Sequence, residues 1–407
     1  MVPARHQFTI LKQVVELIPR NLVAKLAKEF GVDKQSRSIS PWSHVVSLLF
    51  AQLSHALSLN DIVDTLRNHS GALLTVREAV PPSRNGLSNA NRTRNADMAE
   101  ALFWQVLEAF RAKHPTFGMG RKYCGMPRRF KRLINVVDST TIKLVANCMD
   151  WAKHRRKKAA AKCHMRLDLQ TFLPRFAVVK AASTSDATEA HRLCAAMKDG
   201  EVVVFDKANV DYAHLYELTK RGVFWVTRAK DNMAHDRGKA LTNPKGRILC
   251  DRIVRLKAAK SFQLYPEPIR VVEGMIEIDG KEQILTFITN NLEWAPSSIA
   301  ELYKGRWGIE VFFKQIKQTL QLADFLGHNE NAVRWQIWTA LLAYLLLRMI
   351  AFLSEWMRTF ERLFTALRGV LWSRLDMISV LDCCGTASGE IRMRGRPEEA
   401  YLPGFII

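Results

Sequence analysis

The chain has 407 residues, with 60 Lys and Arg against 39 Asp and Glu, a net charge of +21 and 48% hydrophobic residues. This length allows two or three domains with a large core, and the composition excludes a disordered or fibrous chain. The excess of positive charge favours a polyanionic partner, of which nucleic acid is the commonest.

The N-terminal region carries apolar residues at helical spacing over residues 8–69, which predicts several short helices. Ser58 and Asp61 are spaced as a capping box at the start of the last of them. Residues 80–97 are polar and basic, so they fit a solvated linker, the favoured interpretation, or a DNA contact. The side chains available for such a contact are Asn89, Asn91, Arg92 and Arg94.

Two basic blocks follow, at residues 121–132 and 153–162. A solvated surface has the same composition, but beside the acidic residues described below we interpret both blocks as tracks for a phosphate backbone. The DNA-contacting candidates within them are Arg128, Arg129, Arg155 and Arg156.

The middle of the chain changes to strand-like patterns. Short runs rich in β-branched and aromatic residues predict a mixed α/β sheet, and they lie at 133–137, 176–181, 201–205 and 223–227. Residues 247–290 predict an antiparallel meander with a hairpin turn at Asp279–Gly280. From Ser297 almost to Leu381 the pattern is helical.

Two carboxylates follow predicted strands directly. Asp138 comes after residues 133–137, and Asp206 comes after residues 201–205. Open α/β sheets bind ligands at the C-terminal ends of their strands. Two converging carboxylates repel each other unless a divalent cation neutralises them. A turn or helix-capping role is the alternative for each residue.

A helix is predicted over residues 297–320, with a capping box formed by Ser298 and Glu301. Gly305 and Gly308 weaken this helix locally, so a break there is the alternative. One edge of its helical wheel carries a phenol, two cations and a carboxylate. These residues are Tyr303, Arg306, Glu310 and Lys317. A salt-bridged surface would explain the lysine but not the tyrosine and arginine on the same edge.

The spacing of these four residues, Y-x2-R-x3-E-x6-K, resembles the signature of DDE transposases of bacterial insertion sequences, specifically the insertion sequence four family. The resemblance covers about residues 80–350 and implies an RNase H-like α/β catalytic core with a β-rich insertion. It implies a triad of Asp138, Asp206 and Glu310 that holds two Mg²⁺ ions, for which Mn²⁺ can substitute. Many relatives have Arg-Gly-Tyr after the second aspartate, whereas this chain has Lys-Ala-Asn at 207–209.

The implied layout has four parts. A helical N-terminal domain for DNA binding spans 1–75, and a basic linker and helix span 76–130. The catalytic core spans 131–345, with the insertion at about 232–295, and a helical C-terminal region spans 346–407. Asp211 is a fallback for the second aspartate, although it lies five residues beyond the strand end.

The implied function is DNA transposition: binding of the terminal inverted repeats of an insertion sequence, metal-dependent phosphodiester cleavage, and strand transfer into target DNA. The alternatives are a nuclease of the same fold without strand transfer, and an inactive DNA-binding protein descended from a transposase. The residues expected to contact DNA near the cut are Tyr303, Arg306, Lys317, Lys207 and, by base stacking, Trp294, although a core role is also open for Trp294.

Cutting both ends of an element requires two active sites, so a homodimer on DNA is expected. The apolar stripe of the C-terminal helices is a candidate dimer contact and equally an internal core; it consists of Trp356, Phe360, Leu363, Phe364 and Leu367.

The remaining patterns concern the compartment. Seven cysteines without metal-binding spacing indicate reduced thiols. The N-terminus lacks the unbroken apolar stretch of a signal peptide. The apolar segment 335–353 is interrupted by Gln336 and Arg348, which predicts a core helix rather than a membrane span. We expect a cytoplasmic protein, nucleoid-associated when bound to DNA, with no membrane partner.

Overall fold

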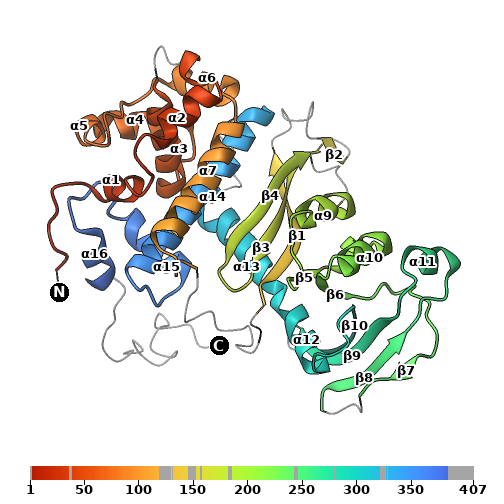
Figure 1. The fold of residues 1–407 in the computed structure, drawn as a ribbon. Coiled ribbons are helices and arrows are strands. Elements are labelled where there is room, and N and C mark those ends of the chain that lie inside the picture. The colour runs from red at the N-terminus through yellow and green to blue at the C-terminus, as the bar shows by residue number, and fades with distance from the viewer. Residues whose placement is uncertain are drawn as a thin grey trace, which may run out of the picture. The chain divides into compact units, whose positions relative to one another are not determined.

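The computed structural model describes residues 2–35, 39–118, 130, 132–144, 153–155, 158–181, 186–242, 246–278, 281–320, 327 and 329–383 (Figure 1). They fall into two compact units. Unit 1 comprises Met1–Ala112, Thr319–Gln321 and Trp335–Ile407, and unit 2 comprises Lys113–Gln318 and Leu322–Arg334.

Unit 1 is helical. Its elements are α1 (Ile10–Val15), α2 (Leu22–Glu29), η1 (Asp33–Gln35), α3 (Pro41–Ser54), α4 (Leu59–Asn68), α5 (Ser70–Leu74), α6 (Arg84–Thr93), α7 (Asp97–Lys113), α14 (Glu330–Leu353), α15 (Phe360–Arg368) and α16 (Met377–Cys383). The capping box predicted for Ser58 and Asp61 is formed at the start of α4. The short helices expected over 8–69 are therefore confirmed.

The linker expected at 80–97 is instead the helix α6, and two of its polar residues are buried. Asn91 bonds to the His44 ring at 2.8 Å. The Arg94 guanidinium donates to the carbonyl oxygens of Ser40, at 3.3 Å, and Ile39. These two side chains hold α6 in place and are not available to DNA, whereas Asn89 and Arg92 lie on its exposed side.

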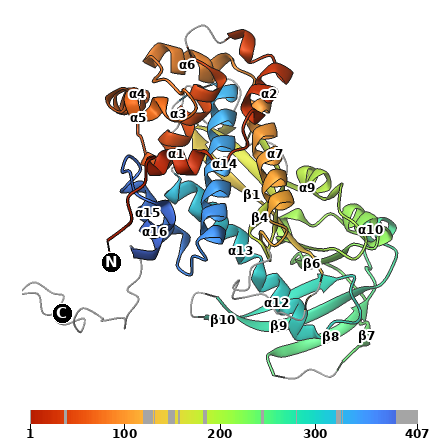
Figure 2. The same cartoon turned by 60° about the vertical axis from the view of Figure 1, so that its left-hand side comes forward.

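Helix α14 is long and apolar enough to cross a membrane, but 78% of its most apolar window is buried inside the protein (Figure 2). This burial supports the core-helix interpretation. The stripe on α15 is also buried, since Phe360, Leu363, Phe364 and Leu367 are at most 7% exposed. Those four residues are core rather than a free dimer surface.

Unit 2 is built on one sheet. The elements along residues 134–319 are β1 (Ile134–Leu144), β2 (Lys153–Arg155), β3 (Lys158–Asp168), β4 (Leu173–Ala181), α9 (Asp186–Cys194), β5 (Val202–Phe205), η3 (Lys207–Asn209), α10 (Tyr212–Lys220), β6 (Phe224–Arg228), β7 (Lys239–Ala240), β8 (Ile248–Val254), α11 (Ala259–Leu264), β9 (Ile269–Ile278), β10 (Lys281–Thr289), α12 (Pro296–Gly305), α13 (Trp307–Lys314) and a π-helical turn, η4 (Gln315–Thr319). Among the described residues the strand order is β2-β3-β1-β5-β6-β10-β9-β8-β7, with β4 paired to β3.

The centre of this sheet is parallel. β1 pairs with β5, and β5 with β6, in parallel, whereas β3 is antiparallel to β1. The meander expected at 247–290 is confirmed as β8, β9 and β10, and β10 pairs with β6, so it extends the same sheet. The turn predicted at Asp279–Gly280 lies outside the described residues.

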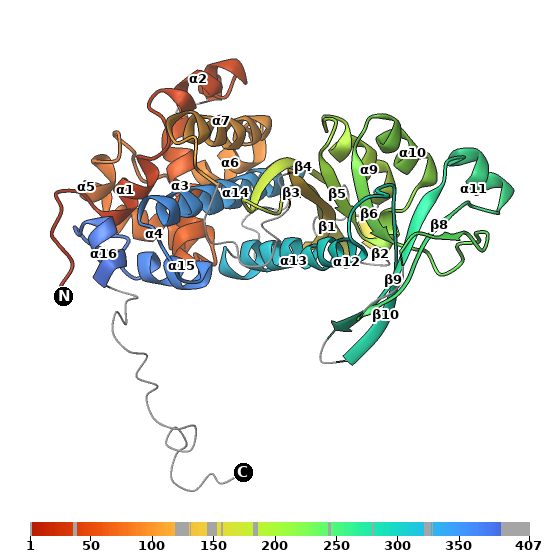
Figure 3. The same cartoon turned by 60° about the horizontal axis from the view of Figure 1, so that its bottom comes forward.

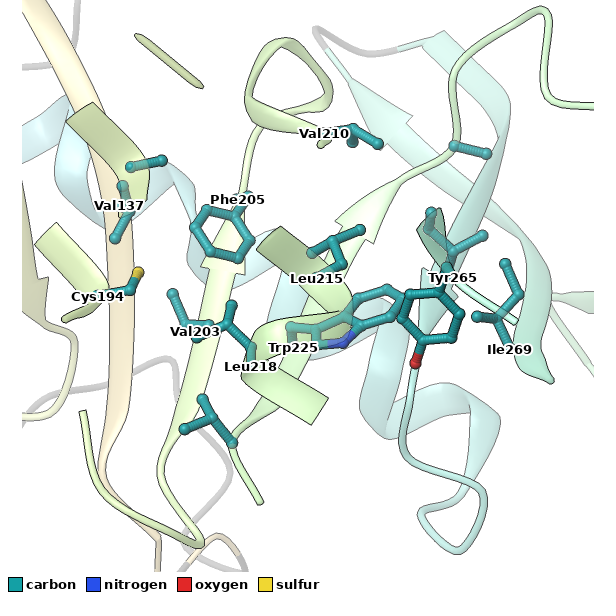
Figure 4. Close-up of a cluster of buried hydrophobic side chains, with 14 of the residues drawn as sticks. Val137, Cys194, Val203, Phe205, Val210, Leu215, Leu218, Trp225, Tyr265 and Ile269 are labelled. Atoms are coloured by element: carbon teal, nitrogen blue, oxygen red, sulfur yellow. The ribbon is translucent and has the colours of Figure 1, made fainter. Parts of the chain in front are cut away.

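Helices cover both faces of the central strands. α9 contacts β1 and β3 and α10 contacts β6 on one face, whereas α12 and α13 lie on the other (Figure 3). Val137, Phe205 and Trp225 belong to the apolar cluster on the α9 and α10 face (Figure 4). Because side chains alternate along a strand, their neighbours in sequence point to the α12 and α13 face.

Candidate active site

Asp138 and Asp206 lie where the pairing of two parallel strands ends. The last pair between β1 and β5 is Val137 with Phe205. The expectation that Asp138 follows its strand is wrong, because β1 continues to Leu144 and is paired there with β3. Asp206 does follow β5 directly. Both aspartates therefore sit at the same end of one parallel pair.

The pleat of the sheet directs these two side chains away from the apolar cluster. Val137 and Phe205 lie within that cluster. Each is followed by its aspartate, so the aspartates face α12 and α13. The sequence already indicated this arrangement, because an apolar run directly precedes each of the two aspartates.

The helix expected over 297–320 is divided. α12 begins at Pro296 after Ala295, without a side-chain cap, so the capping box predicted for Ser298 and Glu301 is absent. Arg306 separates α12 from α13, and its backbone N–H donates to the Tyr303 carbonyl at 3.0 Å. The segment ends in the π-helical turn η4, which carries Lys317.

Two side chains of this segment connect the three carboxylates. The Tyr303 hydroxyl donates to Asp206 Oδ1 at 3.4 Å. Arg306 Nη1 is 3.4 Å from Asp138 Oδ2, and Arg306 Nη2 is 2.8 Å from Glu310 Oε1. The structure thus brings Asp138, Asp206 and Glu310 into one cluster with the tyrosine and arginine of the motif.

The cluster has the electrostatics of crowded carboxylates. Burial raises the pKa of Asp138 to about 6, and the charges of Asp206 and Glu310 add to that rise. Its hydrogen bond from the Ser139 N–H and the charge of Arg306 offset the rise only partly. Burial alone would lower the pKa of Arg306, but its anionic neighbours raise it, so this guanidinium stays charged.

The donor chemistry of the cluster fits a hard divalent cation, because all three groups are carboxylates and such ions take oxygen ligands. As positioned, no three described His, Cys, Asp or Glu side chains form a ready metal site. The Arg306 guanidinium occupies the space between Asp138 and Glu310 and neutralises them instead.

The other candidates near the cluster have protein partners. Lys207 pairs with the exposed Asp231 at 3.1 Å. Burial raises the pKa of the Cys163 thiol on β3 to about 12, and the nearby charge of Lys317 offsets that rise only partly. Asp211, the fallback for the second aspartate, caps α10 by accepting from the N–H groups of Ala213 and His214.

Trp294 packs against Phe130 and Phe224, at ring distances of 5.4 and 5.2 Å. These contacts fit the core interpretation, and its stacking on a base stays a prediction. Of the basic-block candidates, Arg128, Arg129 and Arg156 lie outside the described residues. The same holds for the side chain of Arg155, whose backbone ends β2.

Gly308, which the sequence marks only as weakening the helix, is also a position of close packing. A Cβ atom at this position would lie 3.1 Å from Leu169 Cδ2 and 3.2 Å from Phe172 Cζ, in the turn between β3 and β4. The buried Asp168 holds that turn, accepting from the N–H groups of Gln170 and Thr171. A glycine inside a helical pattern, two residues before the acid of the motif, was the available signal.

Comparison with known proteins identifies the family of the chain. Residues 129–346, more than half of the chain, match the transposase DDE domain, and residues 6–76 match a domain of unknown function, DUF4372. A Sinorhizobium fredii protein named as transposase y4zB is 32% identical over 258 residues, which cover 62% of this chain and 70% of that protein. A Geobacillus stearothermophilus protein named as the transposase of insertion sequence element IS5377 is 30% identical over 54% of this chain and 58% of its own length.

Among solved structures, the piggyBac transposase synaptic complex with hairpin DNA aligns with 96% of this chain and 86% of its own, with a TM-score of 0.45 and 11% identity. That likeness is too distant to establish a shared fold. The family match and the curated relatives are sufficient without it. The chain therefore belongs to the DDE transposases and is an enzyme of DNA cleavage and transposition.

Proposed function

We propose that Asp138, Asp206 and Glu310 are the catalytic and metal-binding triad of this transposase. The observation that carries the proposal is the connection of all three carboxylates through Tyr303 and Arg306 at the end of the β1–β5 pairing. Residues from three distant parts of the chain converge there, and the same face of the sheet holds them.

We also propose that the central strands form an RNase H-like core and that the chain is a member of the insertion sequence four family. The parallel β1, β5 and β6, flanked by the antiparallel β3, support the first assignment. The spacing of Tyr303, Arg306, Glu310 and Lys317 supports the second.

The DDE domain implies dependence on a divalent metal. We assign two Mg²⁺ ions, replaceable by Mn²⁺, to the triad, and the carboxylates of Asp138, Asp206 and Glu310 would hold them. When bound, such a pair of ions activates an attacking oxygen and stabilises the leaving oxygen of a phosphodiester.

The chain's own side chains supply binding and orientation. Arg306 offers a planar fork that matches a phosphate, and Lys317 offers a point charge. Tyr303 orients Asp206 through its hydroxyl. Lys207, beside Asp206, would contact the cleaved strand. Trp294 would stack on one of its bases. Arg128, Arg129, Arg155 and Arg156 would hold the flanking backbone.

We also propose a division of the whole chain. Residues 1–75 form a helical domain that binds the element ends, and residues 76–130 are a basic linker and helix that connect this domain to the catalytic core at 131–345. Residues 346–407 form a helical C-terminal region. Two copies would act together on the terminal inverted repeats and the target, because two ends must be cut. Bound to DNA, the protein would be associated with the nucleoid.

Purified protein tests the triad by nicking of supercoiled plasmid DNA with Mg²⁺ or Mn²⁺. We expect Glu310→Gln to lower nicking by about 1000-fold, equivalent to roughly 4 kcal/mol of transition-state stabilisation, without loss of DNA binding. Glu301→Gln, which removes an exposed carboxylate from the adjacent α12, is the matched control.

Unchanged nicking by Glu310→Gln would contradict the triad. Nicking without joining of element ends to target DNA would favour the nuclease alternative. Metal-independent DNA binding with no nicking by the wild type would favour the inactive alternative, which the Lys-Ala-Asn departure at 207–209 suggests.

A further inference from the structure

Arg306 occupies the position of a cation in the proposed triad. Its two terminal nitrogens contact Asp138 Oδ2 at 3.4 Å and Glu310 Oε1 at 2.8 Å. These oxygens are the atoms that a bound metal would need. The guanidinium and a metal ion shared by Asp138 and Glu310 therefore compete for the same ligands.

The need for such a cation follows from the charges. The three carboxylates of the triad lie close together in a partly buried site, so their mutual repulsion must be offset by positive charge. Among the described residues, Arg306 is the cation that forms ion pairs with two of the three. It supplies the neutralisation that the protein needs before any metal is bound.

The contacts of Arg306 are also weak enough to be exchanged. It makes one contact to each carboxylate rather than a two-pronged pair with either, and one of the contacts is long. Among the described residues its buried Nε has no hydrogen-bond partner, and the Glu310 side chain is 52% exposed. A phosphate group could accept both prongs of the guanidinium and satisfy it better than the carboxylates do.

We propose that Arg306 is an internal stand-in for the metal, which leaves the triad when a DNA phosphate takes its guanidinium. This inference rests on the proposed triad. Metal binding and DNA binding are then positively coupled, because each favours the state in which Arg306 has left Asp138 and Glu310. Coupling of this kind is reciprocal between the two ligands.

The first test measures Mn²⁺ binding to the full-length, DNA-free protein from the electron paramagnetic resonance signal of free Mn²⁺. We expect Arg306→Gln to raise the Mn²⁺ affinity by at least about fivefold, the lower end of typical coupling. Lys304→Gln is the matched control, since it removes an exposed positive charge from the same segment without touching a carboxylate.

Arg306→Lys keeps the charge and secures the test if the glutamine variant is poorly folded, which far-ultraviolet circular dichroism would reveal. Its shorter, unforked side chain should give an affinity between those of wild type and Arg306→Gln. An affinity of either Arg306 variant equal to or below that of Lys304→Gln would overturn the inference.

Asp138→Asn separates this inference from the proposed function. If that variant binds Mn²⁺ as the wild type does, the triad assignment is wrong. If it loses Mn²⁺ while Arg306→Gln gains nothing, the triad stands and the stand-in role fails.

The reciprocal test uses the fluorescence anisotropy of a labelled duplex with and without Ca²⁺, which takes the same oxygen ligands. Ca²⁺ should raise the DNA affinity of the wild type by at least about fivefold more than that of Asp138→Asn. Arg306→Gln should show no such gain, and a gain equal to that of the wild type would contradict the coupling.

Discussion

Two arginine–carboxylate groups in unit 2 use the same chemistry in different ways. Arg270 holds Asp251 with two parallel contacts, of 2.7 and 2.9 Å, and its third nitrogen donates to the Trp294 carbonyl at 2.7 Å. Arg306 instead divides its contacts between Asp138 and Glu310. The first pair is closed, and the second is open to exchange.

Burial separates the two groups further. Arg270 and Asp251 are 1% and 0% exposed, whereas Arg306 and Asp138 are 12% and 20% exposed. The closed pair joins β8 and β9 to the segment that leads into α12, so its role is to stabilise the fold. The open group contains two carboxylates of the proposed triad, Asp138 and Glu310. A fully bonded ion pair favours a fixed structure, and a partly bonded one can exchange partners.

Breaking the closed pair should have the largest effect on stability. Asp251→Asn leaves the Arg270 charge buried and uncompensated, so we expect a loss of about 3–5 kcal/mol in the free energy of unfolding, measured with urea. Arg306→Gln should cost less than that, since its closer partner, Glu310, is half exposed. Similar losses from both variants would remove the distinction between the two groups.

A double variant sharpens this comparison. Asp251→Leu combined with Arg270→Met replaces the pair with apolar side chains and should recover most of the loss of Asp251→Asn. A double variant as unstable as the single one would show that Arg270 acts mainly through the Asn291 and Trp294 carbonyls.

The open group should make stability fall as the pH rises. Burial raises the pKa of Asp138 from its ordinary value of 3.8 to about 6 in the folded protein, so between these values the folded state keeps a proton that the unfolded state has released. We expect metal-free protein to lose about 2–3 kcal/mol between pH 4 and 6.5 from this group, with a plateau above.

Asp138→Asn should abolish that part of the pH dependence in urea unfolding at several pH values. Asp64→Asn, an exposed residue of α4, is the control and should leave the profile unchanged. The same slope in wild type and Asp138→Asn would mean that the triad is not crowded in the way described.

The position of α13 should matter more for activity than for stability. Gly308→Ala gains up to about 1 kcal/mol of helix propensity but pushes against Leu169 and Phe172, so the net stability change should be small. Because Glu310 is two residues away, we expect plasmid nicking to fall about tenfold. Gly71→Ala, where a Cβ meets nothing within 4 Å, should leave nicking unchanged.

Much of the central sheet could be predicted because its strands are apolar runs. The strand β3 could not, since residues 158–168 combine alanines with basic residues and form a strand only between β1 and β4. Asn91 and Arg94 lie in a segment with the composition of a linker, but both side chains are buried and bond to partners far away in the sequence. Tertiary contacts override local propensity in both cases.

The candidate site was predicted as a set of residues but not as a geometry. Spacing alone placed Tyr303, Arg306 and Glu310 on one helical edge, and apolar runs marked Asp138 and Asp206. The close packing at Gly308 depends on the turn between β3 and β4, which lies more than 130 residues earlier in the chain. No local pattern specifies such a contact.

Anomalous diffraction from crystals grown with Mn²⁺ and duplex DNA would locate both the metal and the Arg306 side chain. We predict manganese in contact with the carboxylates of Asp138, Asp206 and Glu310, and Arg306 bonded to a phosphate. Manganese bound elsewhere, with Arg306 still paired to Asp138 and Glu310 beside the DNA, would contradict it.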